Sequence, residues 1–363
     1  MAEILKTRFG APQQRLFVST LRQRVDAYFK NNDISKQANT GMVLKTVAMF
    51  SLYLVPYFLL IFGHLQSDLL MLFLAIVMGM GMAGIGMGVM HDANHGSYSK
   101  YPVVNEFLSY SLCLVGGLPI NWQVQHNTLH HTYTNVHEHD GDLEGPGFLR
   151  FSPHQPRKKV HRFQFLYAWF FYGFLTMAWS TSKDFIQLYR FWKMDLLKSK
   201  NKKYGKQLAL LISTKILYYT YLVVIPMLVM DVAWWKILIG IFSMHYVAGI
   251  FTSTIFQLAH VVEEADFPLP NETGHIENDW IVHQLYTTAD FAPKSRILSW
   301  FIGGLNFQVE HHLFPNICHV HYRKIAKIVE ETAREFNFPY HTQPTFVSAL
   351  WSHSKMLWRL GRA

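Results

Sequence analysis

The sequence predicts an all-α integral membrane protein with four transmembrane helices in two hairpins and a cytosolic helical cap. Three observations lead to this fold class. Only 16% of the 363 residues are charged and 50% are hydrophobic, whereas soluble domains carry about a quarter charged residues. Long apolar runs occur in two separate pairs. The mean hydropathy of +0.08 is too low for a chain wholly buried in lipid, so a sizeable part faces water.

Each predicted span is an apolar run long enough to cross roughly 30 Å of hydrocarbon. The four runs are 42–63, 69–90, 208–230 and 237–258. Two of them contain a single lysine, Lys45 or Lys215, which could snorkel towards an interface. Shorter runs at 103–120 and 163–179 are not counted as spans, and the aromatic-rich second one suits a helix in the interface. Glycines crowd the end of the second span and predict close helix packing.

The distribution of positive charge predicts which side of the membrane each segment occupies. Thirty of the 33 Lys and Arg residues lie outside the two hairpins and their turns, so the positive-inside rule places both termini and both long polar segments in the cytosol. No linker divides the chain, which predicts a single domain. Its parts are a cytosolic N-terminal segment 1–41, a first hairpin 42–90, a cap segment 91–207, a second hairpin 208–258 and a cap segment 259–363.

The composition also excludes several kinds of site and partner. Two cysteines, Cys113 and Cys318, cannot build a disulfide scaffold or a cysteine-based zinc or iron–sulfur site. The net charge of +9 comes with no nucleic-acid-binding motif, so we expect no nucleic-acid partner and a lipid bilayer instead. Twenty histidines are the unusual count, and histidine is the commonest metal ligand.

Three histidine clusters all fall on the predicted cytosolic side. They are His91 and His95; His126, His130 and His131; and His311 and His312, preceded by Gln308. On a helix, residues four apart project from one face, while adjacent histidines point in different directions. This pattern suggests two metals sharing one cavity, against the alternative of a solvated histidine-rich surface. Imidazoles suit Fe, Zn, Cu and Ni, zinc has no redox chemistry, and a pair of irons can reduce O2.

Further residues near the clusters are candidates for supporting roles. His260 ends the fourth span and is a candidate ligand, or else an interfacial histidine with a satisfied hydrogen bond. Asp140, Asp142 and Gln257 are candidates for orienting ligand N–H groups from behind, against a solvated loop for the two acids. The basic run containing Arg157, Lys158 and Lys159 could bind CoA phosphates, or be attracted to anionic lipid.

The clusters resemble the three histidine boxes of membrane fatty acid desaturases. The similarity lies in HDANHGSYS, NWQVQHNTLHHTYTN and GGLNFQVEHHLFP, and it covers about residues 40–320. It implies a four-span, all-α enzyme whose cytosolic cap holds a di-iron site and which introduces a double bond with O2 and two electrons. The implied ligands, with no catalytic residue beyond them, are His91, His95, His126, His130, His131, His260, His311 and His312.

Two departures from the common desaturase pattern refine the expectation. Gln308 stands where many members have a histidine, which resembles front-end desaturases and leaves open whether Gln308 binds iron directly, through water, or not at all. The 363 residues contain no His-Pro-Gly-Gly haem motif, so electrons are expected from a separate carrier, cytochrome b5 or a ferredoxin with its reductase. In lacking this motif, the sequence resembles a bacterial-type enzyme similar to linoleoyl-CoA desaturases.

The resemblance therefore predicts an O2-dependent fatty acyl desaturase with two Fe ions per chain. It would insert a cis double bond into a long acyl chain carried by CoA or a lipid, with front-end (Δ5- or Δ6-like) selectivity. We expect a multi-pass protein of a bacterial inner membrane, or otherwise of the endoplasmic reticulum, with a cytosolic active site. The alternatives are a membrane di-iron hydroxylase or ketolase and, in a different class, a histidine-rich metal transporter.

Overall fold

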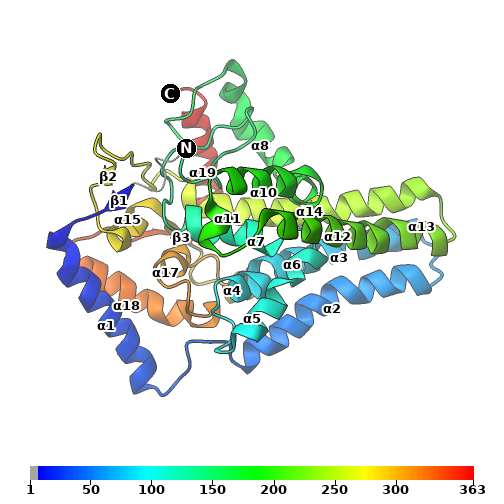
Figure 1. The fold of residues 1–363 in the computed structure, drawn as a ribbon, viewed down its shortest axis with the longest axis horizontal. Coiled ribbons are helices and arrows are strands. Elements are labelled where there is room, and N and C mark those ends of the chain that lie inside the picture. The colour runs from blue at the N-terminus through cyan, green and yellow to red at the C-terminus, as the bar shows by residue number, and fades with distance from the viewer. Residues whose placement is uncertain (1–6) are drawn as a thin grey trace. The chain divides into compact units, whose positions relative to one another are not determined.

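The computed structural model describes residues 7–363, most of which are helical (Figure 1). The chain forms two compact units, and each is assembled from stretches that are separate in the sequence. Unit 1 contains the residues up to Asn39, Gln125–Ala168 and Ile255–Ala363. Unit 2 contains Thr40–Val124 and Trp169–Thr254.

Unit 2 carries the long apolar helices, with shorter helices between them. Its elements are α2 (Thr40–Phe62), α3 (Asp68–Gly84), η3 (Ile85–Val89), α4 (Met90–Asn94), α5 (Pro102–Ser109), α6 (Ser111–Leu114), α7 (Pro119–Trp122), α9 (Leu175–Ala178), η6 (Trp179–Lys183), α10 (Asp184–Lys193), α11 (Leu196–Ser199), α12 (Tyr204–Tyr219), η7 (Thr220–Val224), α13 (Ile225–Val229) and most of α14 (Trp234–His260).

The structure confirms the prediction of four apolar helices that are long enough to cross a membrane. They are Thr40–Phe62, Asp68–Asn94, Tyr204–Val229 and Trp234–His260. A fifth would result only if Pro102–Leu114 and Pro119–His130, bent by 103° at a break, counted as one span. The second helix is longer than predicted because the π-helical turn η3 continues α3 into α4, so His91 lies inside the helix and not after it.

The glycines near the end of α3 allow close helix packing, as the sequence predicts. A Cβ on Gly79 would lie 2.5 Å from the carbonyl oxygen of Met244 in α14. A Cβ on Gly81 would lie 2.6 Å from the amide nitrogen of Tyr53 in α2. Because both neighbours are backbone atoms, which cannot swing away as a side chain can, larger residues at these positions would separate the helices.

Lys215 does not snorkel. Its side chain is buried in unit 2, and Nζ donates to Asp184 Oδ2 at 2.8 Å and to the carbonyl oxygens of Gly116 (2.6 Å) and Trp179 (2.7 Å). Asn121 Nδ2 also donates to Asp184 Oδ1 at 3.0 Å. A buried ammonium needs such a complete set of acceptors, and these ones tie α12 to the start of α10.

Unit 1 contains the N-terminal helix, the segment after the second histidine cluster and the C-terminal part of the chain. Its elements are β1 (Arg8–Phe9), η2 (Pro12–Gln14), α1 (Arg15–Asn31), most of η4 (Gln123–His130), η5 (Lys159–Phe163), about half of α8 (Gln164–Tyr172), the end of α14, β2 (His275–Ile276), α15 (Trp280–Thr287), β3 (Ala289–Phe291), α16 (Arg296–Phe301), α17 (Gln308–Leu313), η8 (His319–His321), α18 (Tyr322–Glu335), β4 (His341–Gln343) and α19 (Phe346–Leu360).

The core of unit 1 supports the helix that carries the third histidine cluster. Buried apolar residues recur every four positions along α1, and they face the buried side of α18, beside which α1 lies in Figure 1. Val309 and Leu313 of α17 belong to the same core, so one side of α17 is fixed by packing. Two short parallel strand pairs, β1 with β2 and β3 with β4, complete the unit.

Candidate metal centre

Six of the eight candidate histidines lie in unit 1 and come from three stretches of chain. His126 and His130 belong to η4 with His131 directly after it, His260 is the last residue of α14, and His311 and His312 belong to α17. All six are buried. The sequence therefore brings together side chains that are up to 186 positions apart.

The second cluster lies on a π-helix and not on the α-helix that its spacing suggests. The amide of His131 donates to the carbonyl oxygen of His126, five residues back, at 2.9 Å. A π-helix has more residues per turn than an α-helix, so positions five apart also share a face. The ring of His126 accordingly lies as close to that of His131 (4.8 Å between centroids) as to that of His130 (5.1 Å).

The first group of converging imidazoles consists of His130, His260 and His312. Their ring centroids are 4.7 to 4.9 Å apart, and one nitrogen from each lies within 4.8 Å of the others. Within residues 7–363, Nε2 of His130 and Nε2 of His260 are buried without a hydrogen-bond partner. Buried nitrogens normally have a partner, so these lone pairs fit a metal ion.

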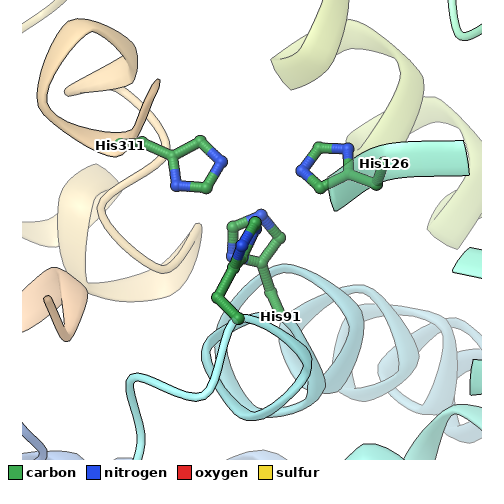
Figure 2. A group of neighbouring side chains, drawn as sticks. His91, His126 and His311 are labelled. Carbon is green, nitrogen blue, oxygen red and sulfur yellow. The ribbon is translucent and has the colours of Figure 1, made fainter. Parts of the chain in front are cut away.

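A second group consists of His131, His311 and His312, with His126 beside it. His131 Nε2 lies 2.9 Å from His311 Nε2 and 3.2 Å from His126 Nε2. In Figure 2 the rings of His126 and His311 project towards one another from their separate elements. Because His312 belongs to both groups, the arrangement provides two adjoining positions for a cation.

Two carboxylates orient the imidazoles of the second cluster. Asp140 Oδ2 accepts from His130 Nδ1 at 2.9 Å, and Asp142 Oδ2 lies 3.4 Å from His126 Nδ1. An Nδ1–H that is held by a carboxylate leaves the Nε2 lone pair for a metal. The Asp140 carboxylate also accepts from the amides of Asn135 and Asp142, both at 3.0 Å, so its position is fixed by the backbone.

The charge around His130 favours a cation. Burial alone would lower the pKa of His130, but the neighbouring carboxylates of Asp140 and Asp142 outweigh burial and leave that pKa raised. An environment that stabilises a proton on this ring would attract a metal ion for the same electrostatic reason. The donor set of neutral imidazoles suits Fe, Cu, Zn or Ni.

Gln284 is a supporting residue that the sequence analysis does not single out. It lies on α15, where its Oε1 accepts from His312 Nδ1 at 2.9 Å and from Thr134 Oγ1 at 2.8 Å. Its Nε2 donates to the carbonyl oxygen of His131 at 3.3 Å. Gln284 therefore connects the second and third clusters, and the one signal in the sequence is a polar residue within the apolar stretch WIVHQLYT.

His91 and His95 lie in unit 2 and are described by themselves. His91 belongs to α4 and His95 caps its C-terminal end, so the spacing of four holds on a helix. Their ring centroids are 4.8 Å apart, and each ring meets Trp122 edge-on, at 5.4 and 5.3 Å. Trp122 thus restricts the orientation of both imidazoles.

The remaining candidates fall into two environments. Gln308 begins α17, one turn before His311, and is buried. Gln257 lies one turn before His260 and is buried, and its Oε1 has no hydrogen-bond partner within the described part of the chain. Arg157, Lys158 and Lys159 are exposed and lie at the start of η5, whose first residue is Lys159. Lys158 Nζ donates to the carbonyl oxygen of Gly147 at 2.9 Å.

Comparison with known proteins agrees with the chemistry of these residues. The family model described as fatty acid desaturase matches residues 67–344. The sn-1 linoleoyl-lipid 6-desaturase of Synechocystis sp. is 36% identical over 98% of this chain and 98% of its own length. The protein of the same name from Arthrospira platensis is 35% identical over 92% of this chain and 89% of its own. The acyl-lipid (8-3)-desaturase of Physcomitrium patens is 36% identical over 95% of this chain and 72% of its own.

The family match covers far more than half of the residues and includes all three histidine clusters, and the relatives align with nearly the whole chain. The oxidoreductase activity predicted from the histidine boxes is thus confirmed at the level of the family. With its four apolar helices the protein is a membrane protein, and it belongs to the fatty acid desaturase family.

Proposed function

We propose that this desaturase is an acyl-lipid enzyme of front-end type that works with two iron ions held by its histidines. The observation that carries the metal part is the convergence of two groups of buried imidazoles that share His312. The observation that carries the substrate part is the end-to-end similarity to proteins named sn-1 linoleoyl-lipid 6-desaturase.

The proposed ligands are the histidines of the three clusters together with His260. His130, His260 and His312 would hold one ion, and His126, His131 and His311 would contribute to the second. His91 and His95 are proposed as ligands because of their motif and their position together at the end of one helix. Gln308 is proposed as a weaker ligand, acting directly or through water. Bound iron would supply the reduction of O2 that removes two hydrogens from an acyl chain.

The chain's own contribution is to fix the direction of each imidazole before a metal arrives. Asp140 holds Nδ1 of His130 and Gln284 holds Nδ1 of His312, while the hydroxyl of Tyr322 lies 3.2 Å from His311 Nδ1. Because each of these contacts is made by Nδ1, the Nε2 of the ring is directed into the cluster. Preorganised ligands of this kind bind a metal with less loss of side-chain entropy.

Substitution of a single ligand tests the metal assignment. We expect His312→Gln to lose bound iron and desaturase activity, because His312 belongs to both groups. A matched control is His353→Gln, since His353 is an equally buried histidine of unit 1 that bonds to the carbonyl oxygen of Val261 (2.7 Å). Iron would be measured by elemental analysis of the purified membrane protein. Full iron content in His312→Gln would contradict the assignment.

Product analysis tests the reaction and the position of the double bond. We expect a host fed linoleic acid to accumulate a product two mass units lighter, with the new bond on the carboxyl side of the existing ones, as resolved by gas chromatography with mass spectrometry. A gain of one oxygen would favour a hydroxylase, and metal flux in liposomes without any lipid product would favour a transporter.

The carrier of the acyl group can be tested at the exposed basic run. If the enzyme takes acyl-CoA, charge reversal of Arg157, Lys158 and Lys159 should raise the apparent KM for acyl-CoA, since these side chains would meet its phosphates. If the enzyme takes an acyl-lipid, we expect the same charge reversal to leave the KM for that lipid unchanged. The substituted protein should then bind anionic vesicles more weakly. Supplying the enzyme with defined glycerolipids in place of acyl-CoA gives the direct comparison.

The membrane side and the electron donor complete the proposal. We propose that the histidine clusters face the cytosol, because of the distribution of Lys and Arg, and that the membrane is a bacterial inner membrane. Cysteine labelling from either side of sealed vesicles tests the side. Reconstitution with a ferredoxin and its reductase, against cytochrome b5 with its reductase, tests which separate carrier supplies the electrons.

A further inference from the structure

A buried cluster of three polar side chains lies at α17, and the proposed reaction does not use it. It consists of Asp290 in β3, Glu310 in α17 and Tyr340, which directly precedes β4. The hydroxyl of Tyr340 donates to Asp290 Oδ2 at 2.8 Å and approaches Glu310 Oε1 at 3.1 Å. The side chains of Asp290 and Glu310 are fully buried.

The cluster also holds the backbone at the start of α17. Asp290 Oδ1 accepts from the amide of Val309 at 3.0 Å. That amide is one of the first in the helix and has no partner inside it, and the N-cap residue Phe307 cannot provide a side-chain acceptor. Asp290 therefore caps α17 from a different element, and the capped turn is the one before His311 and His312.

Strand pairing fixes Tyr340 relative to Asp290. β3 and β4 are parallel, with Ala289 opposite His341 and Asp290 opposite Thr342. Tyr340 is thus one residue before the paired strand, which brings its hydroxyl to the carboxyl of Asp290. Through this ladder the C-terminal part of the chain determines where α17 begins.

The composition of the cluster is not what stability alone would favour. Within residues 7–363 neither carboxyl forms an ion pair, and Glu310 Oε2 is buried without a hydrogen-bond partner. The two buried carboxyls meet at one tyrosine hydroxyl, which lies 2.8 Å from Asp290 Oδ2 and 3.1 Å from Glu310 Oε1. An apolar core would avoid the cost of burying these groups.

We propose that Asp290, Glu310 and Tyr340 are positioning residues that hold α17 in the rotation at which His311 and His312 reach the metal site. The inference rests on the proposed function, because it takes His311 and His312 to be metal ligands. Packing of Val309 and Leu313 fixes one side of α17, the cluster fixes its first turn, and Glu310 is adjacent to His311. A small rotation of α17 would move both imidazoles at once.

The decisive variant is Tyr340→Phe in the full-length protein, since it removes the shared hydroxyl and keeps the ring. Metal affinity would be measured with Co²⁺ against a chelator, following the visible absorption of the histidine-bound ion. We expect about tenfold weaker binding and a changed spectrum, as found when residues behind metal ligands are altered. The matched control is Tyr167→Phe, which removes a hydroxyl that donates to backbone carbonyls of Phe148 and Val160 in the same unit.

A pair of substitutions at Glu310 separates positioning from folding. Glu310→Gln keeps the shape and can donate a hydrogen bond to Asp290, so we expect it to bind Co²⁺ within about threefold of the unsubstituted protein. Glu310→Ala removes one of the two carboxyls at the Tyr340 hydroxyl and should weaken Co²⁺ binding. If Glu310→Ala does not fold, the comparison of Tyr340→Phe with Tyr167→Phe still tests whether the cluster positions α17.

The outcomes distinguish this inference from the proposed function. If the unsubstituted protein binds Co²⁺ and Tyr340→Phe binds it as tightly, or if Tyr167→Phe weakens binding equally, the positioning role is wrong and the metal site stands. If the unsubstituted protein binds no metal, and His312→Gln changes nothing, the proposed function is overturned and this inference with it.

Discussion

The hydrogen bond between His130 and Asp140 allows a sharp prediction about metal affinity. Both side chains are completely buried, and the bond is 2.9 Å long. Asp140→Asn would keep the shape and remove the charge. The amide could offer its single oxygen to His130 and to the Asn135 amide, but its NH2 group would then face the amide of Asp142, which the carboxylate now accepts at 3.0 Å.

The size of the effect follows from these contacts. A hydrogen bond to a charged group contributes about 1.5–3 kcal/mol, against about 0.5–1.5 kcal/mol for a neutral pair. Loss of a residue that orients a metal ligand weakens binding by about 10- to 100-fold, which equals about 1.4–2.7 kcal/mol. We expect Asp140→Asn to lie in this range, because His130 would lose the charge that favours a cation beside it.

Asp142→Asn is the matched control. Asp142 lies 3.4 Å from His126 Nδ1 and its side chain is 16% exposed, so water can replace part of the interaction and we expect less than about threefold weaker binding. Fe²⁺ affinity would be measured for both variants by competition with a chelator, and folding by thermal denaturation in detergent. Equal effects of the two substitutions, or a larger effect of Asp142→Asn, would refute the reasoning.

Three further predictions concern stability. Gly249→Ala places a Cβ 2.3 Å from the carbonyl oxygen of Gly173, so we expect a loss of about 1–3 kcal/mol, measured by SDS unfolding in mixed micelles; an unchanged midpoint would show that the helices can separate freely. Lys215→Met leaves Asp184 buried without its partner and should cost about 3–5 kcal/mol, most of which Asp184→Asn in the same chain should restore. Burial lowers the pKa of His353 to about 4, below the roughly 6.5 of an unfolded histidine. The unfolded chain therefore binds the extra proton first, and stability falls as the pH drops from about 6.5 to 4, by up to about 3 kcal/mol. In His353→Gln the melting temperature should depend less steeply on pH in that range. A pH profile identical to that of the unsubstituted protein would contradict the lowered pKa of His353.

The spans could be predicted from the sequence because their signal is local. An uncharged run of about twenty residues is long enough to cross a bilayer, and all observed helix ends lie within four residues of the predicted ones, with the largest differences at Asn94 and Tyr204. Lys215 shows the limit of such reasoning. Hydropathy alone cannot tell a lysine that reaches the interface from one that bonds to Asp184, 31 positions away.

The histidine groups were predictable as residues but not as an arrangement. Spacing of four places His91 and His95 together on a helix, as expected. The π-helical turn at His126 was not predictable, because the extra residue in the turn depends on packing and not on composition. Gln284 and Asp290 could not be identified either, since no motif marks them and only the fold brings α15 and β3 to α17. The prediction of a single domain stays a prediction.

The two histidine groups of unit 1 share His312 but are not equivalent. The group with His130 and His260 is wholly buried and has the Asp140 carboxylate directly behind one ligand. The group with His131 and His311 has neutral partners at two rings, the Tyr322 hydroxyl at His311 and the amide of Gln284 at His312. Its carboxylate, Asp142, lies farther away, 3.4 Å from His126 Nδ1, and is partly exposed. Since imidazoles carry no negative charge, the nearby carboxylate is what balances a divalent ion. The fold thus provides two positions of unequal charge on either side of one shared ring, and that asymmetry follows from Asp140 and Gln284, not from the histidines themselves.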